Sequence, residues 1–338
     1  MKTIVSRCLL MAVSVVVASL LLTVGSVAAA AQPAGPSSKS GGPQQFFSVG
    51  GGTTGGAFFI VAAAMATVLE KNVPGIKVTA ESTAASTENG RRLGRGELDL
   101  GLVAADVAYY AARGAREFAR DGRKYDNLRV MMCGYSSPLQ MFTLAQSNIK
   151  TVEDIRGKRV YVLTGTTIQA HLPAALKAFG ITNKDYKETA ASTEAIVDAV
   201  REGQADVGII SGGAPLVAVT DLTTRHSVRF LPVPPEKAAQ IRQENAWYVP
   251  GVIKAGVYRG MTQDVPSVEV PIFLMTRQDL DTELVYRMTK ALAEHTADLE
   301  AVYPLAAAFT AEQSTKTAPI VPFHPSAERY YKERGLLK

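Results

Sequence analysis

The chain repeats part of its own sequence. The hexapeptide TAASTE at residues 83–88 recurs at residues 189–194, an offset of 106 residues. The pattern GxxDxG, followed by apolar residues, starts at Gly96 and recurs 107 residues later at Gly203. Two matches in nearly the same register indicate an internal duplication. We therefore expect two related units in this chain.

Each unit has the local pattern of a short helix followed by a buried strand. Ser86 and Ser192 can cap the free N–H groups of a helix, and a glutamate two residues further on falls in the first turn, where the helix dipole favours an anion. Gly96 and Gly203 can end that helix, and a short apolar strand follows.

A turn rich in glycine and threonine opens an apolar helix ahead of each pattern. In the first unit the turn covers residues 50–56 and the helix residues 57–70, and in the second the turn covers residues 164–167 and the helix residues 168–179. The strands expected beside these helices are residues 46–49, 76–81 and 159–163. Alternating strands and helices predict a parallel sheet flanked by helices, built twice.

The paired turns favour a binding cleft. They follow strands, and open α/β sheets bind ligands at the carboxyl ends of their strands. Helix N-termini at that edge present free N–H groups suited to a carboxylate or another anion. The alternative is that glycine and threonine serve here only as turn and cap residues. The recurrence of the turns in paired positions favours the cleft.

Three carboxylates lie beside expected strands. Asp99 and Asp206 precede strands, where turn and cap roles account for them. Asp106 directly follows a strand, so it either faces the cleft or caps the helix expected over residues 107–113.

Two strand-like runs flank the second unit. Residues 139–144 and 268–275 are candidates for the two crossings between the units, which a hinge requires. A loop-rich aromatic stretch that begins at Trp247 and Tyr248 is expected either in the core or on the cleft wall. Residues 281–299 are predicted to form one amphipathic helix.

The N-terminus has the layout of a secretory signal. Lys2 and Arg7 precede an apolar run over residues 8–24, and small residues lead to Ala31, after which we expect cleavage. The run is nearly long enough to span a bilayer, so an uncleaved anchor is the alternative. Residues 32–45, mainly Pro, Gly, Ser and Gln, are expected to be a disordered linker.

The composition fits an exported globular protein. A length of 338 residues predicts two domains. The net charge of +5 is spread along the chain without a run of five Lys or Arg, which favours a solvated surface over nucleic-acid binding. Removal of Lys2 and Arg7 with the signal lowers this charge to +3 and leaves Cys133 as the one cysteine, which we expect to be buried.

Complete catalytic motifs are missing from the sequence. Gly50, Gly52 and Gly55 form GxGxxG, but the acidic residue of a dinucleotide site, expected about 20 positions later, is missing. The four histidines lack paired-ligand spacing, and neither GxSxG nor GxxxxGK[ST] occurs. We therefore expect no catalytic residue, no metal site and no cofactor.

Eight stretches of the sequence carry a family resemblance. They are GGGTTGGAFF, ESTAASTEN, GELDLGLVAADVAYYA, TVEDIRGKRV, TGTT, ISGGAP, AGVYRG and HPSAERYYKERG. From Phe46 to its C-terminus the chain resembles the TAXI family of solute receptors for tripartite (TRAP) transporters. The resemblance implies a two-lobed periplasmic-binding-protein fold of the α/β class (type II-like). In that fold each lobe is a mixed or parallel sheet flanked by helices, and a hinge links the lobes around a central cleft.

The resemblance also implies an organisation and a function. Residues 1–31 would be the signal peptide and 32–45 the linker, with lobe one formed by 46–138 plus 268–338 and lobe two by 139–267. The implied function is a non-enzymatic periplasmic receptor that captures a small organic anion, such as glutamate or 2-oxoglutarate, and delivers it to TRAP membrane subunits. A monomer that binds no nucleic acid is expected. A ligand-sensing adaptor and an exported α/β enzyme are the alternatives.

The ligand-binding positions implied by the resemblance are Gly52, Thr53, Thr54, Gly55, Phe58, Ser86, Asn89, Asp106, Thr164, Thr166, Thr167 and Gly213. The chain departs from the family at three places. Family members often have a Tyr pair at Phe58–Phe59, Gly-Gly at Ala84–Ala85 and Gln-Ser at Ala104–Ala105. Apolar replacements at these places predict a pocket better suited to a less polar monocarboxylate than to a dicarboxylate.

Overall fold

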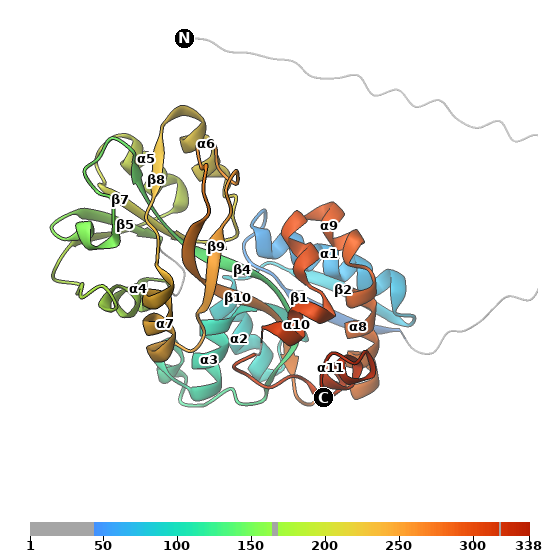
Figure 1. Cartoon of the computed structure of the whole chain (residues 1–338). Coiled ribbons are helices and arrows are strands. Elements are labelled where there is room, and N and C mark those ends of the chain that lie inside the picture. The colour runs from blue at the N-terminus through green and yellow to red at the C-terminus, as the bar shows by residue number, and fades with distance from the viewer. Residues whose placement is uncertain (1–43, 164–167, 318) are drawn as a thin grey trace, which may run out of the picture. The chain divides into compact units, whose positions relative to one another are not determined.

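The computed structural model describes residues 44–163, 168–317 and 319–338, and within them two segments fold with the same order of elements (Figure 1). The first segment contains β1 (Gln45–Gly50), α1 (Ala57–Asn72), β2 (Ile76–Glu81), α2 (Ser86–Arg95) and β3 (Leu100–Ala104). The second contains β5 (Arg159–Leu163), α4 (Ile168–Lys177), β6 (Lys187–Ala191), α5 (Thr193–Arg201) and β7 (Val207–Ser211). In each segment the first strand pairs in parallel with the other two, as the duplication predicts.

Two long strands join these parallel sheets into one mixed sheet. Strands β4 (Leu128–Leu144) and β10 (Val265–Arg277) pair antiparallel with each other. The first part of β4 pairs with β10 and its last residues with β7 and β8 (Val228–Phe230), while β10 also pairs with β3 and with β9 (Val249–Ile253). The strand order is β2-β1-β3-β10-β4-β7-β5-β6, and both expected crossings lie within β4 and β10.

The other helical segments cover the sheet and its connections. They are α3 (Ala105–Arg113), η1 (Arg116–Asp121), η2 (Val152–Ile155), α6 (Val217–Arg225), α7 (Pro235–Glu244), α8 (Thr282–Glu294), α9 (Thr296–Val302), η3 (Pro304–Ala308), α10 (Ala311–Lys316) and α11 (Pro325–Glu333). Within the described ranges, no helix is long and apolar enough to cross a membrane.

The single helix predicted over residues 281–299 is wrong. The chain forms α8 and α9 instead, because His295 leaves the helical conformation at φ −125° and ψ 38° and lies between them. Its ring Nδ1 lies 2.8 Å from the carbonyl oxygen of Ala291. Apolar residues recur on both sides of His295, so their pattern could not reveal this break.

One apolar cluster continues across the sheet crossings, from β3 and α3 to β5 and β7, and two further clusters pack beside the first and the second segment. Met65 and Leu69 of α1 belong to one cluster with strands β1 to β3, and Ile196 and Val200 of α5 belong to another beside β7. Cys133 is fully buried on β4, as expected. Burial of these side chains is the main favourable contribution to folding, at about 25 cal/mol per Å² of apolar surface.

Asp99 and Asp206 make equivalent links in the two segments. A carboxylate oxygen of Asp99 accepts a hydrogen bond from the backbone N–H of Ser48 on β1 at 2.9 Å. Asp206 accepts one from the backbone N–H of Arg159 on β5 at 2.8 Å, and its other oxygen lies 2.7 Å from the Arg159 guanidinium. Both carboxylates therefore fasten the first strand of a segment to the turn before its third strand.

The two predicted serine caps have different roles. Ser192 caps α5, because its hydroxyl accepts a hydrogen bond from the N–H of Ala195 at 3.3 Å. Ser86 is not a cap. It is the first residue of α2, and the N-cap is Ala85, held at a φ of +63°. The Ser86 hydroxyl instead accepts a hydrogen bond from the N–H of Ala104 at 3.0 Å, so it ties α2 to the end of β3.

Candidate ligand-binding site

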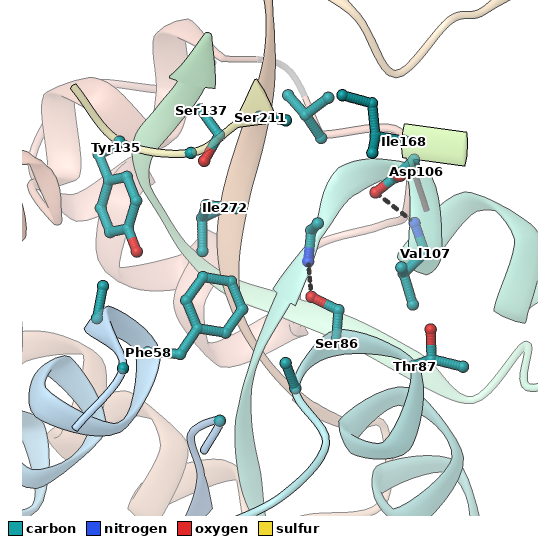
Figure 2. A pocket seen from close by; sticks show the side chains of 18 of the residues that line it. Phe58, Ser86, Thr87, Asp106, Val107, Tyr135, Ser137, Ile168, Ser211 and Ile272 are labelled. Carbon is teal, nitrogen blue, oxygen red and sulfur yellow. Dashed lines mark hydrogen bonds between the residues drawn. The ribbon is translucent and has the colours of Figure 1, made fainter. Parts of the chain in front are cut away.

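A pocket of about 310 Å³ lies at the carboxyl ends of β1, β3 and β7 (Figure 2). Its wall is formed by the turn after β1, the first turns of α1, α2 and α3, and the segment of residues 211–216 that follows β7. The crossing strands contribute Tyr135, Ser137, Leu139, Val270 and Ile272, and Ile168, Tyr248 and Tyr303 complete the lining. A cleft at this edge of the sheet is what the paired turns predicted.

Four helices begin at the pocket without a side-chain cap. The N-caps of α1, α2, α3 and α6 are Gly56, Ala85, Ala104 and Leu216, and within the described residues no side chain accepts a hydrogen bond at these caps. Of the helices that begin elsewhere, α5, α8, α10 and α11 have side-chain caps at Ser192, Asp281, Thr310 and His324, whereas α7 and α9 do not. Uncapped first turns present N–H donors and a partial positive charge, which suits an anionic ligand.

The turn after β1 is divided between the pocket and the surface. Gly52 and Thr53 line the pocket. Thr54 and Gly55 are exposed and outside the lining, because the Thr54 hydroxyl points to Ser82, at 3.3 Å, and Gly55 adopts a φ of +84° that carries the chain away. The two residues therefore shape the turn and do not contact the pocket space.

Asn89 lies behind the pocket wall. It is fully buried, and its side-chain amide donates hydrogen bonds to the carbonyl oxygens of Gly50, Gly51 and Leu102 at distances of 2.7 to 3.1 Å. These contacts join the end of β1 to β3. The structure therefore places Asn89, which was expected to bind ligand, outside the lining and in a supporting position.

Asp106 lines the pocket in the first turn of α3. Its side chain is 2% exposed, and its Oδ1 accepts a hydrogen bond from the N–H of Val107 at 2.8 Å (Figure 2). The cap position belongs to Ala104. Asp106 therefore faces the cleft, which is one of the two roles expected of it. It is not the cap of α3, and its hydrogen bond to Val107 lies within the first turn of the helix.

The remaining predicted positions have three outcomes. Phe58, Ser86 and Gly213 are in the lining. Thr164, Thr166 and Thr167 lie outside the described residues. Ala84, Ala85 and Ala104, three of the positions at which the chain departs from the receptors it resembles, also line the pocket.

Most of the lining is apolar. The apolar side chains are Phe58, Val107, Leu139, Ile168, Leu216, Val270 and Ile272, together with several alanines. Among the described lining residues, Asp106 carries the one charged side chain, and hydroxyl groups supply most of the other polar side-chain atoms. Such a lining favours a ligand with an apolar body and few charges.

Three tyrosines in the lining were not predicted as site residues. Burial raises the pKa of Tyr135, Tyr248 and Tyr303, so their phenols stay neutral and can donate hydrogen bonds to a ligand. Tyr248 belongs to the aromatic stretch for which a cleft role was one expectation. Tyr303 is distant in sequence from every motif, so the pattern gave no signal for it.

Gln140 and Tyr258 hold the segment that follows β7. The amide of Gln140 donates to the carbonyl oxygen of Gly212 at 3.0 Å, and the Tyr258 hydroxyl donates to the amide oxygen of Gln140 at 2.7 Å. The same hydroxyl accepts a hydrogen bond from the N–H of Leu216 at 2.9 Å, and burial raises the pKa of Tyr258 to about 12. These bonds fix the place of Gly213 in the wall.

Comparison with solved structures identifies the class of fold. A TctC solute binding protein from Polaromonas superposes with a TM-score of 0.54 at 13% sequence identity, over 87% of this chain and 99% of that chain. The periplasmic aliphatic sulphonate binding protein SsuA from Escherichia coli matches with a TM-score of 0.48 at 16% identity, over 87% and 94%. The likeness to the Polaromonas protein shows the fold: this chain has the α/β fold of two-lobed solute-binding proteins, as predicted.

A protein-family comparison then identifies the family. The sequence model of the NMT1-like family matches residues 49–335. This chain belongs to the NMT1-like family. The resemblance to TAXI receptors is narrower than this family. It bears on which ligand is bound and which membrane partner receives it, and both are matters of the proposed function.

Proposed function

We propose that this protein is a periplasmic receptor of the TAXI type. In this proposal the signal peptide ending at Ala31 exports the chain, the pocket binds a small organic anion, and the loaded receptor delivers that anion to the membrane subunits of a TRAP transporter. The fold of two-lobed solute-binding proteins supports this proposal.

The uncapped helix N-termini carry the proposal that the ligand is an anion. A ligand carboxylate beside Ser86 and Thr87 would meet the first N–H groups of α2, with the first turn of α1 on the other side of Gly52. A carboxylate there would replace the missing caps, because it satisfies donors that have no partner within the helix.

The apolar wall supports the further proposal that the anion is a monocarboxylate with an apolar body. A second carboxylate among Ile272, Val270 and Leu139 would lose its hydration without gaining a charged partner from the described lining. Glutamate and 2-oxoglutarate each carry two carboxylates, so we expect them to bind more weakly than an aliphatic or aromatic monoacid.

We also propose that β4 and β10 are the hinge between two lobes, residues 46–138 plus 268–338 and residues 139–267. The partner of β4 changes at this boundary, from Glu269 of β10 opposite Pro138 to Ser211 of β7 opposite Leu139. Two adjacent strands that continue from one lobe into the other permit a bending motion and restrict other movements.

The ligand class is tested by native mass spectrometry of the exported protein, purified without ligand exchange. The expected result is a one-to-one adduct whose mass, after release by denaturant, is that of an acid with a single carboxylate. Release of a cationic or neutral compound would exclude the anion assignment. Delivery is tested separately: deletion of the gene should abolish uptake of that acid, whereas a sensing adaptor would leave uptake intact and alter gene expression.

A further inference from the structure

The segment after α3 concentrates positive charge. Residues 113–124 hold five basic and two acidic side chains, a net charge of +3. Residues 44–338 together carry only +2, because Lys2, Arg7 and Lys39 account for the rest of the total of +5. All five basic residues of the segment are exposed. We call them the basic surface: Arg113, Arg116, Arg120, Arg123 and Lys124.

The acidic side chains of the segment contribute little to this surface. Asp121 accepts hydrogen bonds from the Arg91 guanidinium at 2.7 Å and from the Tyr125 hydroxyl at 3.1 Å. Partial burial acts to raise the pKa of Asp121, but these hydrogen bonds lower it overall, so the carboxylate stays ionised and bound to Arg91. Glu117 is half-buried.

Aromatic rings hold several of the guanidinium groups in place. Arg113 lies 3.6 Å from the ring centre of Tyr109, and Arg123 lies 5.0 Å from that of Tyr125. The two ends of the segment also meet, since a Cβ atom on Gly114 would lie 3.2 Å from Cγ of Lys124. The fold of the segment therefore brings Arg113 and Lys124 close together, and the ordering of two guanidinium groups by the rings lowers the entropy lost on binding.

We propose that the basic surface binds the phosphate headgroups of an anionic membrane. Arginine pairs bidentately with phosphate, and a cluster of four to eight Lys or Arg residues is typical of binding to anionic lipids. Arg120 and Lys124 make no hydrogen bond or ion pair through their side chains with other described residues, so both are available to headgroups.

The position of the surface relates this binding to the pocket. Asp106 and Val107 in the first turn of α3 line the pocket and the helix ends at Arg113, so the basic surface begins roughly 10 Å from the pocket along the helix axis. Contact with headgroups would hold the receptor near the plane in which a membrane transporter resides. The inference concerns this surface alone and does not depend on the identity of the ligand.

The test is co-sedimentation of the exported protein with vesicles of phosphatidylcholine, with and without phosphatidylglycerol, at low and at high salt. Preferential binding to the phosphatidylglycerol vesicles is expected, and it should weaken with salt as screening increases. In the double variant Arg120→Glu with Lys124→Glu, partitioning to these vesicles should fall by about tenfold or more.

A matched control keeps the change in net charge constant. Lys184→Glu with Lys290→Glu reverses two exposed lysines outside the basic surface and should leave binding within about twofold of the unmodified protein. Thermal unfolding of both double variants checks that the fold is intact. Equal binding to both kinds of vesicle would overturn the proposal, and this is the result expected if the basic surface binds an acidic protein instead. Equal losses of binding in the two double variants would also overturn it.

Discussion

Gly213 and Leu305 meet at the pocket. A Cβ atom built on Gly213 would lie 2.4 Å from Cδ1 of Leu305, closer than real Cβ contacts. The φ of Gly213 is not in the left-handed region, so glycine is required here for space and not for its conformation. Gly213 follows β7, whereas Leu305 belongs to η3, which packs against β4 and α9. The contact therefore joins two segments that lie in different proposed lobes.

Gly213→Ala should destabilise the arrangement of the pocket in which Gly213 and Leu305 are in contact, which we take as the closed arrangement of the proposed lobes. The added methyl group forces the Leu305 side chain to move, whereas an open arrangement would accept it without cost, so the equilibrium shifts toward the open state. We expect the bound acid to dissociate about tenfold faster in stopped-flow measurements, equivalent to about 1.4 kcal/mol. The double variant Gly213→Ala with Leu305→Ala should restore most of the original rate. An unchanged rate in the single variant would show that this contact does not control closure.

Asn89→Ala should lower stability. The substitution leaves the buried carbonyl oxygens of Gly50, Gly51 and Leu102 without their shared donor, for an expected loss of about 2–4 kcal/mol in the free energy of unfolding by urea. Asn72→Ala is the control, because its amide bonds one carbonyl within α1 and the side chain is half-buried, so the loss should stay near 1 kcal/mol or below. A weaker affinity for ligand with unchanged stability would instead support the direct binding role expected from the resemblance.

Asp206→Asn should make stability less sensitive to acid. The hydrogen bond from the Arg159 side chain is the main factor that lowers the pKa of Asp206 from its ordinary 3.8. A carboxyl whose pKa is lower in the folded state stabilises the fold above its unfolded pKa, and this contribution disappears as the pH falls through the folded value. The slope of the unfolding free energy below about pH 4 should therefore decrease in the variant. The matched control is Asp279→Asn, at a carboxylate that is 76% exposed.

Phe58→Ala should reduce affinity for acids with long apolar bodies more than for short ones. Loss of an aromatic wall removes about 1.5–3 kcal/mol of favourable contact, so octanoate should bind about 10 to 100 times more weakly, while acetate should change little. Phe46→Ala removes a ring that is 76% exposed outside the lining and should leave both affinities unchanged. Parallel losses for the two acids would show that Phe58 supports the fold and not the apolar end of the ligand.

Much of the local structure could be predicted from sequence because the signals are local. Strands β2 and β5 begin and end where the apolar alternation does. Gly96 is the C-cap of α2, at a φ of +75°. The role of a residue was harder to predict from the sequence where it depends on a partner that is distant along the chain. The sequence around Ser86 is typical of a helix cap, yet its hydroxyl accepts a hydrogen bond from the N–H of Ala104 at the end of β3.

The same limit applies to the pocket. Its glycine and threonine turn and Asp106 follow strands directly, so the topology alone places them at the correct edge. Tyr135 lies on β4 itself, whereas Tyr303 reaches the pocket only because η3 packs against β4, where the two rings lie 6.3 Å apart. No spacing in the sequence encodes that contact, since 168 residues separate the two tyrosines.

Isothermal titration of ligand-free protein with a matched set of compounds tests the central claim most directly. The set is octanoate, octanamide, octylamine and the dicarboxylate suberate, which have the same number of carbon atoms and differ in charge. We expect octanoate to bind one to one with a negative heat-capacity change, suberate to bind more weakly, and the amide and amine not to bind. Binding of octylamine or octanamide in preference to octanoate would contradict the assignment of the pocket to an anion with a single carboxylate.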